Sequence, residues 1–297
     1  MFVIGLGDGL GNQMFQYAFY YSMKKTYRQS RILFDDRYYY GSVNAHNGIE
    51  IPRIFGLDIP VCTKKQAMAL ADYHIEIKKQ HPFMSFIWGL RKTIYGAKES
   101  YLTFDDATSY YKEVYELNPL RSYYLRGNWI NENYFAGYHD EIVGLFTFPE
   151  IDDEQNREIA SDIEHTNSVS LHLRAGDYIN NPDLEQLGED YYTSAINYIS
   201  DKTNQDVKLF VFSDDINYAE RKLSFIKNKV FVRGNTGVNS YRDMQLMSLC
   251  KHNITANSTF SFWGAYLNMN NEKIVIAPKK ASRNCMNSFA CSDWILK

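Results

Sequence analysis

Short apolar runs alternate with segments of helical spacing along most of this 297-residue chain. At the N-terminus, residues 2–4 are apolar and enter a glycine-rich stretch. Residues 12–25 have helical spacing without glycine or proline, and residues 31–34 are predicted as a second strand. A strand, a tight loop, a helix and another strand in this order begin a parallel α/β domain. We therefore predict an α/β fold for the N-terminal part of the chain.

A second α/β series begins near residue 165. Residues 168–174 alternate between apolar and polar side chains, and residues 207–212 form a nearly continuous apolar run, as a buried parallel strand does. Shorter strands are predicted at residues 230–232, 253–256 and 273–277, and helices at residues 191–200, 240–251 and 260–269. Polar residues follow several of these strands, and open parallel sheets bind ligands at the carboxyl ends of their strands.

The chain length permits two domains of ordinary size. The acidic stretch at residues 150–158 is the best boundary, which gives domains at residues 1–150 and 151–297. Between residues 41 and 137 the sequence mixes tyrosine-rich loops with helical stretches at residues 63–79 and 83–95. The 24 Tyr, 18 Phe and 4 Trp of the chain can stack on sugars or bases, but each ring is more often a core residue.

Charge and cysteine content narrow the functional classes. The net charge of −3 and the lack of a basic tail argue against a nucleic-acid partner. The N-terminus does not resemble a signal peptide, no run of about 18 apolar residues is present, and the four cysteines lack metal-site spacing. We therefore expect a cytoplasmic protein with reduced thiols. The apolar and basic residues at 78–92 favour either a buried helix or peripheral contact with the inner face of a membrane.

Four glycines punctuate the loop after the first apolar run, at positions 5, 7, 9 and 11. Their spacing does not satisfy the G-x-G-x-x-G pattern of dinucleotide sites in any register, although Asp35 stands where the ribose-binding acid of such a site would fall. The loop precedes a helix, whose first N–H groups can bind an anion. From the residues alone, an anion-binding loop and a purely structural loop both remain open.

The segment around Arg174 follows the alternating strand. Strand geometry places His172 and Arg174 on the same face at the end of the strand, before a glycine-containing turn. The planar fork of donors on an arginine suits a diphosphate. The chain contains no D-x-D triplet of the kind that metal-dependent nucleotide-sugar transferases use. Arginine in place of a metal is consistent with this composition, and a structural pair between Arg174 and Asp177 is the alternative.

Two further polar stretches follow predicted strands. Asp214 and Asp215 come directly after the strand at 207–212, where a carboxylate can accept the N1 and N2 protons of guanine or can cap a helix. Small polar residues at 257–259 precede a predicted helix, where they can offer donors to a phosphate or form an N-cap with an aromatic staple. Each pattern alone has a structural alternative, so a functional interpretation depends on their combination.

Together these pieces resemble glycosyltransferase family 11, the α-1,2-fucosyltransferases, and its bacterial members in particular. Residues 9–18 resemble the N-terminal motif of the family, and residues 172–178 resemble a peptide shared with protein O-fucosyl and α-1,6-fucosyl enzymes. Residues 212–215 and 257–261 match two later motifs in order. The family implies a GT-B-like architecture of two facing Rossmann-like domains with a donor cleft between them. The N-terminal domain would then carry the acceptor side and the glycine loop, and the C-terminal domain would bind GDP-fucose.

The resemblance also implies roles for individual residues. Arg174 would bind the β-phosphate and stabilise the departing GDP, and Asn12 would orient the acceptor at the catalytic site. Asp177 would anchor the arginine, with a role as a base as the alternative. The residues implied in donor binding are Gly11, Gln13, His172, Asp214, Asp215, Asn257, Ser258, Thr259 and Phe260. One position departs from the family pattern, because Ala175 stands where a second arginine often follows the first.

By resemblance, the chain is an inverting galactoside α-1,2-fucosyltransferase that requires no metal and no cofactor. It would transfer L-fucose from GDP-β-L-fucose to the 2-OH of a β-galactoside, in glycan, O-antigen or capsule biosynthesis. Its expected partners are GDP-fucose and a galactose-terminated oligosaccharide or lipid-linked glycan. A dinucleotide-dependent oxidoreductase, favoured by the glycine loop, and a non-catalytic glycan-binding protein, permitted by the aromatic content, are the alternatives. No residue is assigned as the general base.

Overall fold

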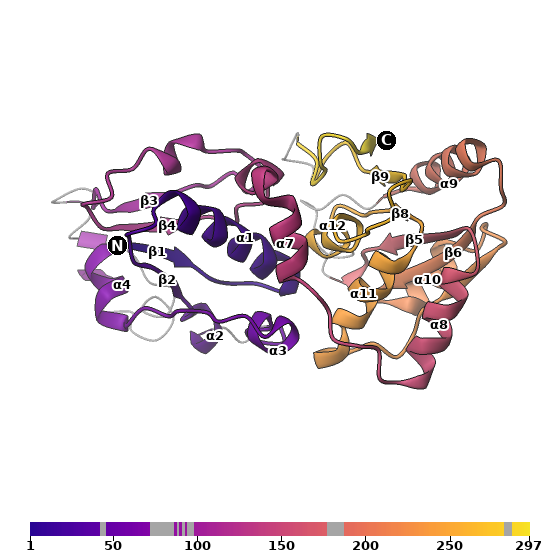
Figure 1. Cartoon of the computed structure of the whole chain (residues 1–297), viewed down its shortest axis with the longest axis horizontal. Helices are drawn as coiled ribbons and strands as arrows, with labels where there is room; N and C mark the ends of the chain where they lie inside the picture. The colour runs from indigo at the N-terminus through magenta and orange to yellow at the C-terminus, as the bar shows by residue number, and fades with distance from the viewer. Residues whose placement is uncertain are drawn as a thin grey trace. The chain divides into compact units, whose positions relative to one another are not determined.

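The computed structural model describes residues 1–41, 46–71, 86–87, 89–90, 93, 98–176, 187–281 and 287–297 (Figure 1). The chain divides into two compact units, Met1–Thr147 (unit 1) and Phe148–Lys297 (unit 2). The predicted boundary at residue 150 lies three residues from this division. Each unit contains a parallel sheet with helices, so the predicted α/β class is confirmed.

Unit 1 is built on a four-stranded sheet with the order β2-β1-β4-β3, in which every pairing is parallel. Its strands are β1 (Phe2–Gly5), β2 (Ile32–Asp35), β3 (Tyr101–Thr103) and β4 (Tyr123–Arg126). β1 lies between β2 and β4, and its apolar side chains are fully buried. The chain leaves β1 for β2 on one side and later supplies β4 on the other, so β1 is the switch point of this sheet.

Helices cover both faces of the unit 1 sheet. α1 (Leu10–Thr26) packs on one face, where the rings of Tyr17 and Tyr20 lie 6.2 and 4.8 Å from the ring of Phe34 in β2. α4 (Lys64–Leu70) covers the other face and forms a buried cluster with Val3 and Leu33. Shorter helical segments are α2 (Tyr38–Gly41), α3 (Ile51–Phe55), η1 (Lys112–Tyr115), η2 (Glu132–Tyr134), η3 (Ala136–Tyr138) and α7 (His139–Leu145).

Core packing accounts for many aromatic rings of unit 1. Trp129 stacks on Phe19 of α1 with a centroid distance of 3.9 Å, and Tyr134 packs edge-on against both rings. The sequence pattern predicts only loops and helices in this tyrosine-rich segment, and that prediction is wrong, because β3 and β4 come from it. The consecutive residues Tyr123 and Tyr124 are both buried in the sheet, so β4 has no apolar–polar alternation to reveal it.

Unit 2 contains a six-stranded parallel sheet with the order β10-β9-β8-β5-β6-β7. Its strands are β5 (Ser168–Leu173), β6 (Lys208–Ser213), β7 (Lys229–Phe231), β8 (His252–Ile254), β9 (Val275–Ala277) and β10 (Ile295–Leu296). The strands predicted between residues 168 and 277 are confirmed, with ends shifted by one or two residues. The short edge strand β10 follows the last strand that the sequence predicts.

Alternate side chains of β6 belong to buried clusters on opposite faces of the sheet. Leu209 and Val211 pack with α9 (Glu189–Thr203) and α10 (Ile216–Lys222). Phe210 and Phe212 pack with α8 (Glu154–Glu164) and α11 (Tyr241–Leu249). Because helices cover both faces, every residue of β5 is buried. Two further helical segments are η5 (Gly237–Asn239) and α12 (Thr259–Tyr266), the second of which follows β8.

Two predicted features fall wholly or partly outside the described residues. Asp177 is one of them. The other is the segment 78–92, of which the structure describes Phe86, Ile87, Gly89 and Leu90; the side chains of Phe86 and Leu90 are 67% and 51% exposed. Within the described ranges, no helix has the length and apolar character needed to cross a membrane.

Candidate functional site

β5 is the switch point of the unit 2 sheet. The chain continues from β5 to β6 and β7 on one side and later supplies β8 on the other. These strands are parallel, so their carboxyl ends meet at one edge, which is where open sheets bind ligands. The register pairs Leu173 with Ser213 and Leu171 with Ile254. The polar residues that follow β5, β6 and β8 therefore converge at this edge.

An ion pair joins the loops that follow β5 and β6. Arg174 Nη1 lies 2.8 Å from Asp214 Oδ2, and the backbone N–H of Ala175 donates to Asp214 Oδ1 at 2.8 Å. The loop after β5 therefore holds the Asp214 carboxylate through both oxygens. The side chains of Arg174 and Asp214 are 29% and 27% exposed, so the guanidinium is fixed in position and still accessible to a ligand.

The two residues after Arg174 shape this ion pair. A Cβ atom at Gly176 would lie only 2.4 Å from Asp214 Oδ2, the oxygen that Arg174 binds. Ala175 is fully buried in the apolar cluster that contains Tyr192. Gly176 therefore leaves room for the carboxylate, while Ala175 contributes a backbone N–H to the site and a methyl group to the core.

His172 is the buried polar residue nearest the end of β5. It is 5% exposed, and its Nδ1 has no hydrogen-bond partner among the described residues. Burial, together with the smaller effect of the Arg174 charge, lowers the pKa of His172 to about 3, so the imidazole is neutral at physiological pH. Its ring centroid lies 6.1 Å from that of Phe260 in α12. The fold therefore brings together the motif at residues 172–178 and the motif at residues 257–261.

Asp215 and Ser258 cap helices at this edge. Asp215 accepts a 2.9 Å hydrogen bond from the Tyr218 N–H at the start of α10, and Ser258 Oγ accepts a 3.3 Å bond from the Phe260 N–H at the start of α12. The capping interpretation of these residues is thus confirmed. Asn257 is 3% exposed, and Thr259 is the half-buried first residue of α12.

The glycine loop of unit 1 is held by two glutamines of α1. Gln16 Oε1 accepts a 3.0 Å bond from the Gly7 N–H. Gln13 is fully buried; its Nε2 donates to the Gly48 carbonyl at 2.8 Å, and its Oε1 accepts from the Glu50 N–H at 2.8 Å. The carboxamide of Gln13 is therefore a structural link between the start of α1 and a distant loop.

Asn12 and Gly11 lie in the first turn of α1. Asn12 Nδ2 donates to Asp8 Oδ2 at 3.0 Å, and Asp8 has a φ of 65°, which is uncommon for a residue other than glycine. Gly11 is buried. These two residues and Gln13 belong to unit 1, whereas the remaining predicted site residues belong to unit 2.

Sequence reasoning did not identify the roles of Gly176, Gln16 and Asp8. The glycine after Ala175 indicates a turn, but its closeness to Asp214 depends on the register of two strands. Gln16 stands three residues after Gln13 and so shares its helix face, which is a usable signal. Nothing in the sequence reveals the positive φ of Asp8. Among the described residues, no group of three or more His, Cys, Asp or Glu side chains is arranged to hold a metal ion.

Comparisons with known proteins agree with the motifs. The family model described as glycosyl transferase family 11 matches residues 70–296. The O-antigen biosynthesis glycosyltransferase WbnK of Escherichia coli is 32% identical over 307 residues, which covers 98% of this chain and 98% of that protein. An alpha-1,2-colitosyltransferase of Escherichia coli is 32% identical over 305 residues, covering 99% of this chain and 97% of that protein.

Solved structures of fucosyltransferases are more distantly similar. NodZ alpha-1,6-fucosyltransferase, soaked with GDP-fucose, is 13% identical with a TM-score of 0.47 and covers 90% of this chain and 92% of its own. FUT1 of Arabidopsis thaliana, in complex with GDP, is 14% identical with a TM-score of 0.49 and covers 92% of this chain and 69% of its own.

Proposed function

The chain belongs to glycosyltransferase family 11, and we propose that it transfers L-fucose from GDP-β-L-fucose to the 2-OH of a β-galactoside. The observation that carries this proposal is the Arg174–Asp214 pair at the switch point of the unit 2 sheet. An arginine held in this way can stabilise the charge that develops on a departing diphosphate. Family membership also favours a glycosyltransferase over the oxidoreductase and glycan-binding alternatives.

The proposed donor site lies at the carboxyl edge of β5, β6 and β8. Arg174 contacts the β-phosphate, and the N-terminus of α12 adds backbone N–H groups and the positive end of its dipole. The neutral imidazole of His172 and the ring of Phe260 lie at the nucleoside end of this site. Asp214 holds Arg174 in place and is therefore a positioning residue.

The proposed reaction is a single displacement with inversion. The acceptor hydroxyl oxygen attacks the anomeric carbon of fucose while the bond to GDP breaks, so a β-linked donor gives an α-linked product. GDP leaves with the bonding electron pair, and the hydroxyl proton is released to water. Negative charge accumulates on the diphosphate, where Arg174 and the donors of Ser258 and Thr259 stabilise it without a divalent metal. Asn12 orients the acceptor.

Each unit has its own part in the proposal. As in the GT-B architecture that the sequence motifs predict, we assign acceptor binding to unit 1 and donor binding to unit 2. The relative WbnK is named for O-antigen biosynthesis, and we propose the same process here. The acceptor is then a galactose-terminated oligosaccharide or a lipid-linked glycan.

GDP-colitose is a second candidate donor, because one of the two similar Escherichia coli proteins is named an alpha-1,2-colitosyltransferase. Colitose is L-fucose with hydrogen in place of the 3-hydroxyl, so a GDP-linked colitose would present the same diphosphate to Arg174. The two donors differ by one hydroxyl group. A site that bonds this hydroxyl strongly disfavours the donor that lacks it, whereas an apolar site discriminates much less.

Transfer from each donor tests the proposal. GDP-fucose and GDP-colitose are supplied separately with EDTA, with lactose and a β-1,3-galactoside as acceptors, and NMR identifies the linkage and anomeric configuration of the product. We expect an α-1,2 product and a loss of at least about 100-fold in kcat for Arg174→Ala. Arg221→Ala, at an exposed position of α10, is the matched control. A product with retained β configuration, or an Arg174→Ala variant as active as Arg221→Ala, contradicts the proposal.

A further inference from the structure

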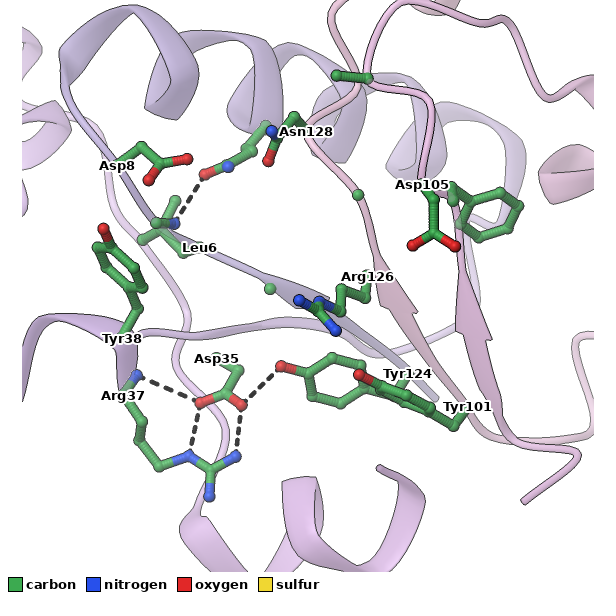
Figure 2. Close-up of a pocket in the computed structure, with 16 residues that line it drawn as sticks. Leu6, Asp8, Asp35, Arg37, Tyr38, Tyr101, Asp105, Tyr124, Arg126 and Asn128 are labelled. Atoms are coloured by element: carbon green, nitrogen blue, oxygen red, sulfur yellow. Dashed lines mark hydrogen bonds and ion pairs between the residues drawn. The ribbon is translucent and has the colours of Figure 1, made fainter. Parts of the chain in front are cut away.

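Unit 1 contains a cavity of about 360 Å³ at the carboxyl ends of its strands (Figure 2). All residues that line it belong to unit 1. The cavity lies next to β1, the switch point of this sheet, so it occupies the position at which open parallel sheets bind ligands. Its volume falls in the range of about 300–1,000 Å³ that is typical of small-molecule sites.

A buried ion pair forms the floor of this cavity. Arg37 Nε donates to Asp35 Oδ1 at 2.6 Å, Arg37 Nη2 donates to Asp35 Oδ2, and the Tyr124 hydroxyl donates to the same oxygen at 2.8 Å. Burial alone would raise the pKa of Asp35, but Arg37 and Tyr124 outweigh burial and lower it. The two charges of the floor therefore compensate each other, and the Asp35 oxygens already have donors.

Two charged side chains of the cavity wall, unlike the buried Asp35–Arg37 pair, are exposed. Arg126 ends β4 and Asp105 follows β3; both residues are exposed, and Figure 2 shows their side chains extending toward the cavity. Within the described part of the chain, neither side chain takes part in an ion pair. The Phe104 N–H donates to the Arg126 carbonyl at 2.8 Å, which fixes the two wall segments relative to each other.

The loop after β4 is held in an unusual conformation. Trp129 has a φ of 59°, which is rare for a bulky residue, and its ring is buried against Phe19. A Cβ atom at Gly127 would lie 3.1 Å from the Trp129 ring, so the small residue allows the close approach. This loop therefore fixes the backbone of Arg126 and Asn128, the residues on either side of Gly127, before a ligand binds. Such preorganisation lowers the entropy cost of binding.

Aromatic rings supply the apolar part of the lining. The rings of Tyr101 and Tyr124 lie 5.5 Å apart at 50°, and a Cβ atom at Gly7 would lie 3.3 Å from the ring of Tyr38. A sugar ring has apolar C–H faces and a polar edge of hydroxyl groups. Rings next to charged side chains therefore match the two kinds of surface that a sugar presents.

The charge of the lining disfavours an anionic ligand. The charges of Asp35 and Arg37 cancel each other. The remaining charged groups of the lining are the carboxylates of Asp8 and Asp105 and the single guanidinium of Arg126, so the lining has a net negative charge. A phosphate would be repelled at such a site. A hydroxyl group can donate to a carboxylate and accept from a guanidinium, so two adjacent hydroxyls of a neutral sugar can bridge Asp105 and Arg126.

We propose that the cavity of unit 1 binds a sugar ring of the acceptor through adjacent hydroxyls held between Asp105 and Arg126. This inference rests on the proposed function, because it identifies the ligand as the acceptor of the glycosyl transfer. Asp105 and Arg126 are then specificity-determining residues that act on the acceptor and leave donor binding unchanged.

Saccharide binding without donor tests this assignment. Lactose and methyl β-galactoside are titrated into the full chain, with binding followed by saturation-transfer NMR and calorimetry. We expect Arg126→Gln and Asp105→Asn each to weaken binding about tenfold, the loss expected for a hydrogen bond to a charged group, and to raise the acceptor KM to match. Arg121→Gln, just before the other end of β4, and Asp140→Asn, at an exposed position of α7, make the same charge changes away from the cavity and should bind as the wild type does.

GDP affinity separates this inference from the proposed function. A wild-type chain that binds neither saccharide overturns the assignment, as does an Arg126→Gln variant that loses GDP affinity and keeps saccharide affinity. If the wild type does not bind GDP but lactose binding still depends on Arg126, the donor chemistry is wrong and the assignment of the cavity to a sugar stands.

Discussion

Gly176→Ala is the smallest change that should disturb the Arg174–Asp214 pair. The added Cβ atom would lie 2.4 Å from Asp214 Oδ2, and real Cβ atoms essentially never approach closer than 3.0 Å. The carboxylate oxygen must therefore retreat by at least about 0.6 Å. Asp214 is a short side chain whose oxygens are held by Arg174 and by the Ala175 N–H, so this movement lengthens and weakens at least one of the two contacts.

The expected loss of GDP affinity in Gly176→Ala follows from the energy of the weakened Asp214 contact. A hydrogen bond to a charged group contributes about 1.5–3 kcal/mol, and partial exposure of both side chains reduces this, so we use about 1–2 kcal/mol. That energy corresponds to a factor of about 5–30. Because the pair positions Arg174 for the diphosphate, we expect the loss in GDP affinity and in kcat/KM, with the free energy of unfolding lowered by no more than about 1 kcal/mol.

Calorimetry with GDP and steady-state transfer measure this effect. Gly144→Ala is the matched control, because no atom lies within 4 Å of a Cβ placed there. Asp214→Asn removes the charge at the same contact, so the losses from Gly176→Ala and Asp214→Asn should overlap in the double variant and not add. Wild-type GDP affinity in Gly176→Ala, or full additivity of the two losses, refutes the positioning role of Asp214.

Three further predictions concern other parts of the chain. Gln13→Leu leaves the buried Glu50 N–H without its acceptor and should lower the free energy of unfolding in urea by about 2–4 kcal/mol; a loss under about 1 kcal/mol contradicts the structural role of Gln13. The pKa of His172 is about 3 in the folded state against 6.5 ordinarily, so the unfolded state binds more protons between these values and stability falls as the pH drops from 6.5 toward 3. His172→Phe should remove up to about 1.4 kcal/mol per pH unit from the slope of unfolding free energy against pH, and an unchanged slope would show that His172 is not buried neutral. If Phe86 and Leu90 contact a membrane, Phe86→Ser combined with Leu90→Ser should reduce sedimentation with anionic liposomes, and a wild type that does not sediment rules this contact out.

The strands that the sequence predicts are those whose burial leaves a simple pattern. β5 alternates between apolar and polar residues and β6 is a continuous apolar run, so both are identified within one residue at their ends. β4 begins with two buried tyrosines and β10 has only two residues, so neither carries a period long enough to recognise. Their places in the sheets depend on contacts with distant strands.

The residues of the candidate site also differ in whether the local sequence pattern predicts their roles. Arg174 and His172 are predictable because strand alternation and the motif place them at the end of β5. That Asp214 holds Arg174 depends on the pairing of Leu173 with Ser213, which a local pattern does not contain. Gln13 belongs to the N-terminal motif at residues 9–18, yet its carboxamide bonds the backbone of residues far along the sequence. A motif therefore indicates that a residue matters and leaves open whether it contacts a ligand or holds a loop.

A crystal structure of the chain with GDP, grown in EDTA, tests the central claim most directly. We predict the diphosphate at the carboxyl edge of β5, β6 and β8, with a phosphate oxygen within hydrogen-bond distance of the Arg174 guanidinium and the nucleoside next to His172 and Phe260. A diphosphate bound instead at the glycine loop of unit 1, or one that contacts neither Arg174 nor the start of α12, would contradict the account.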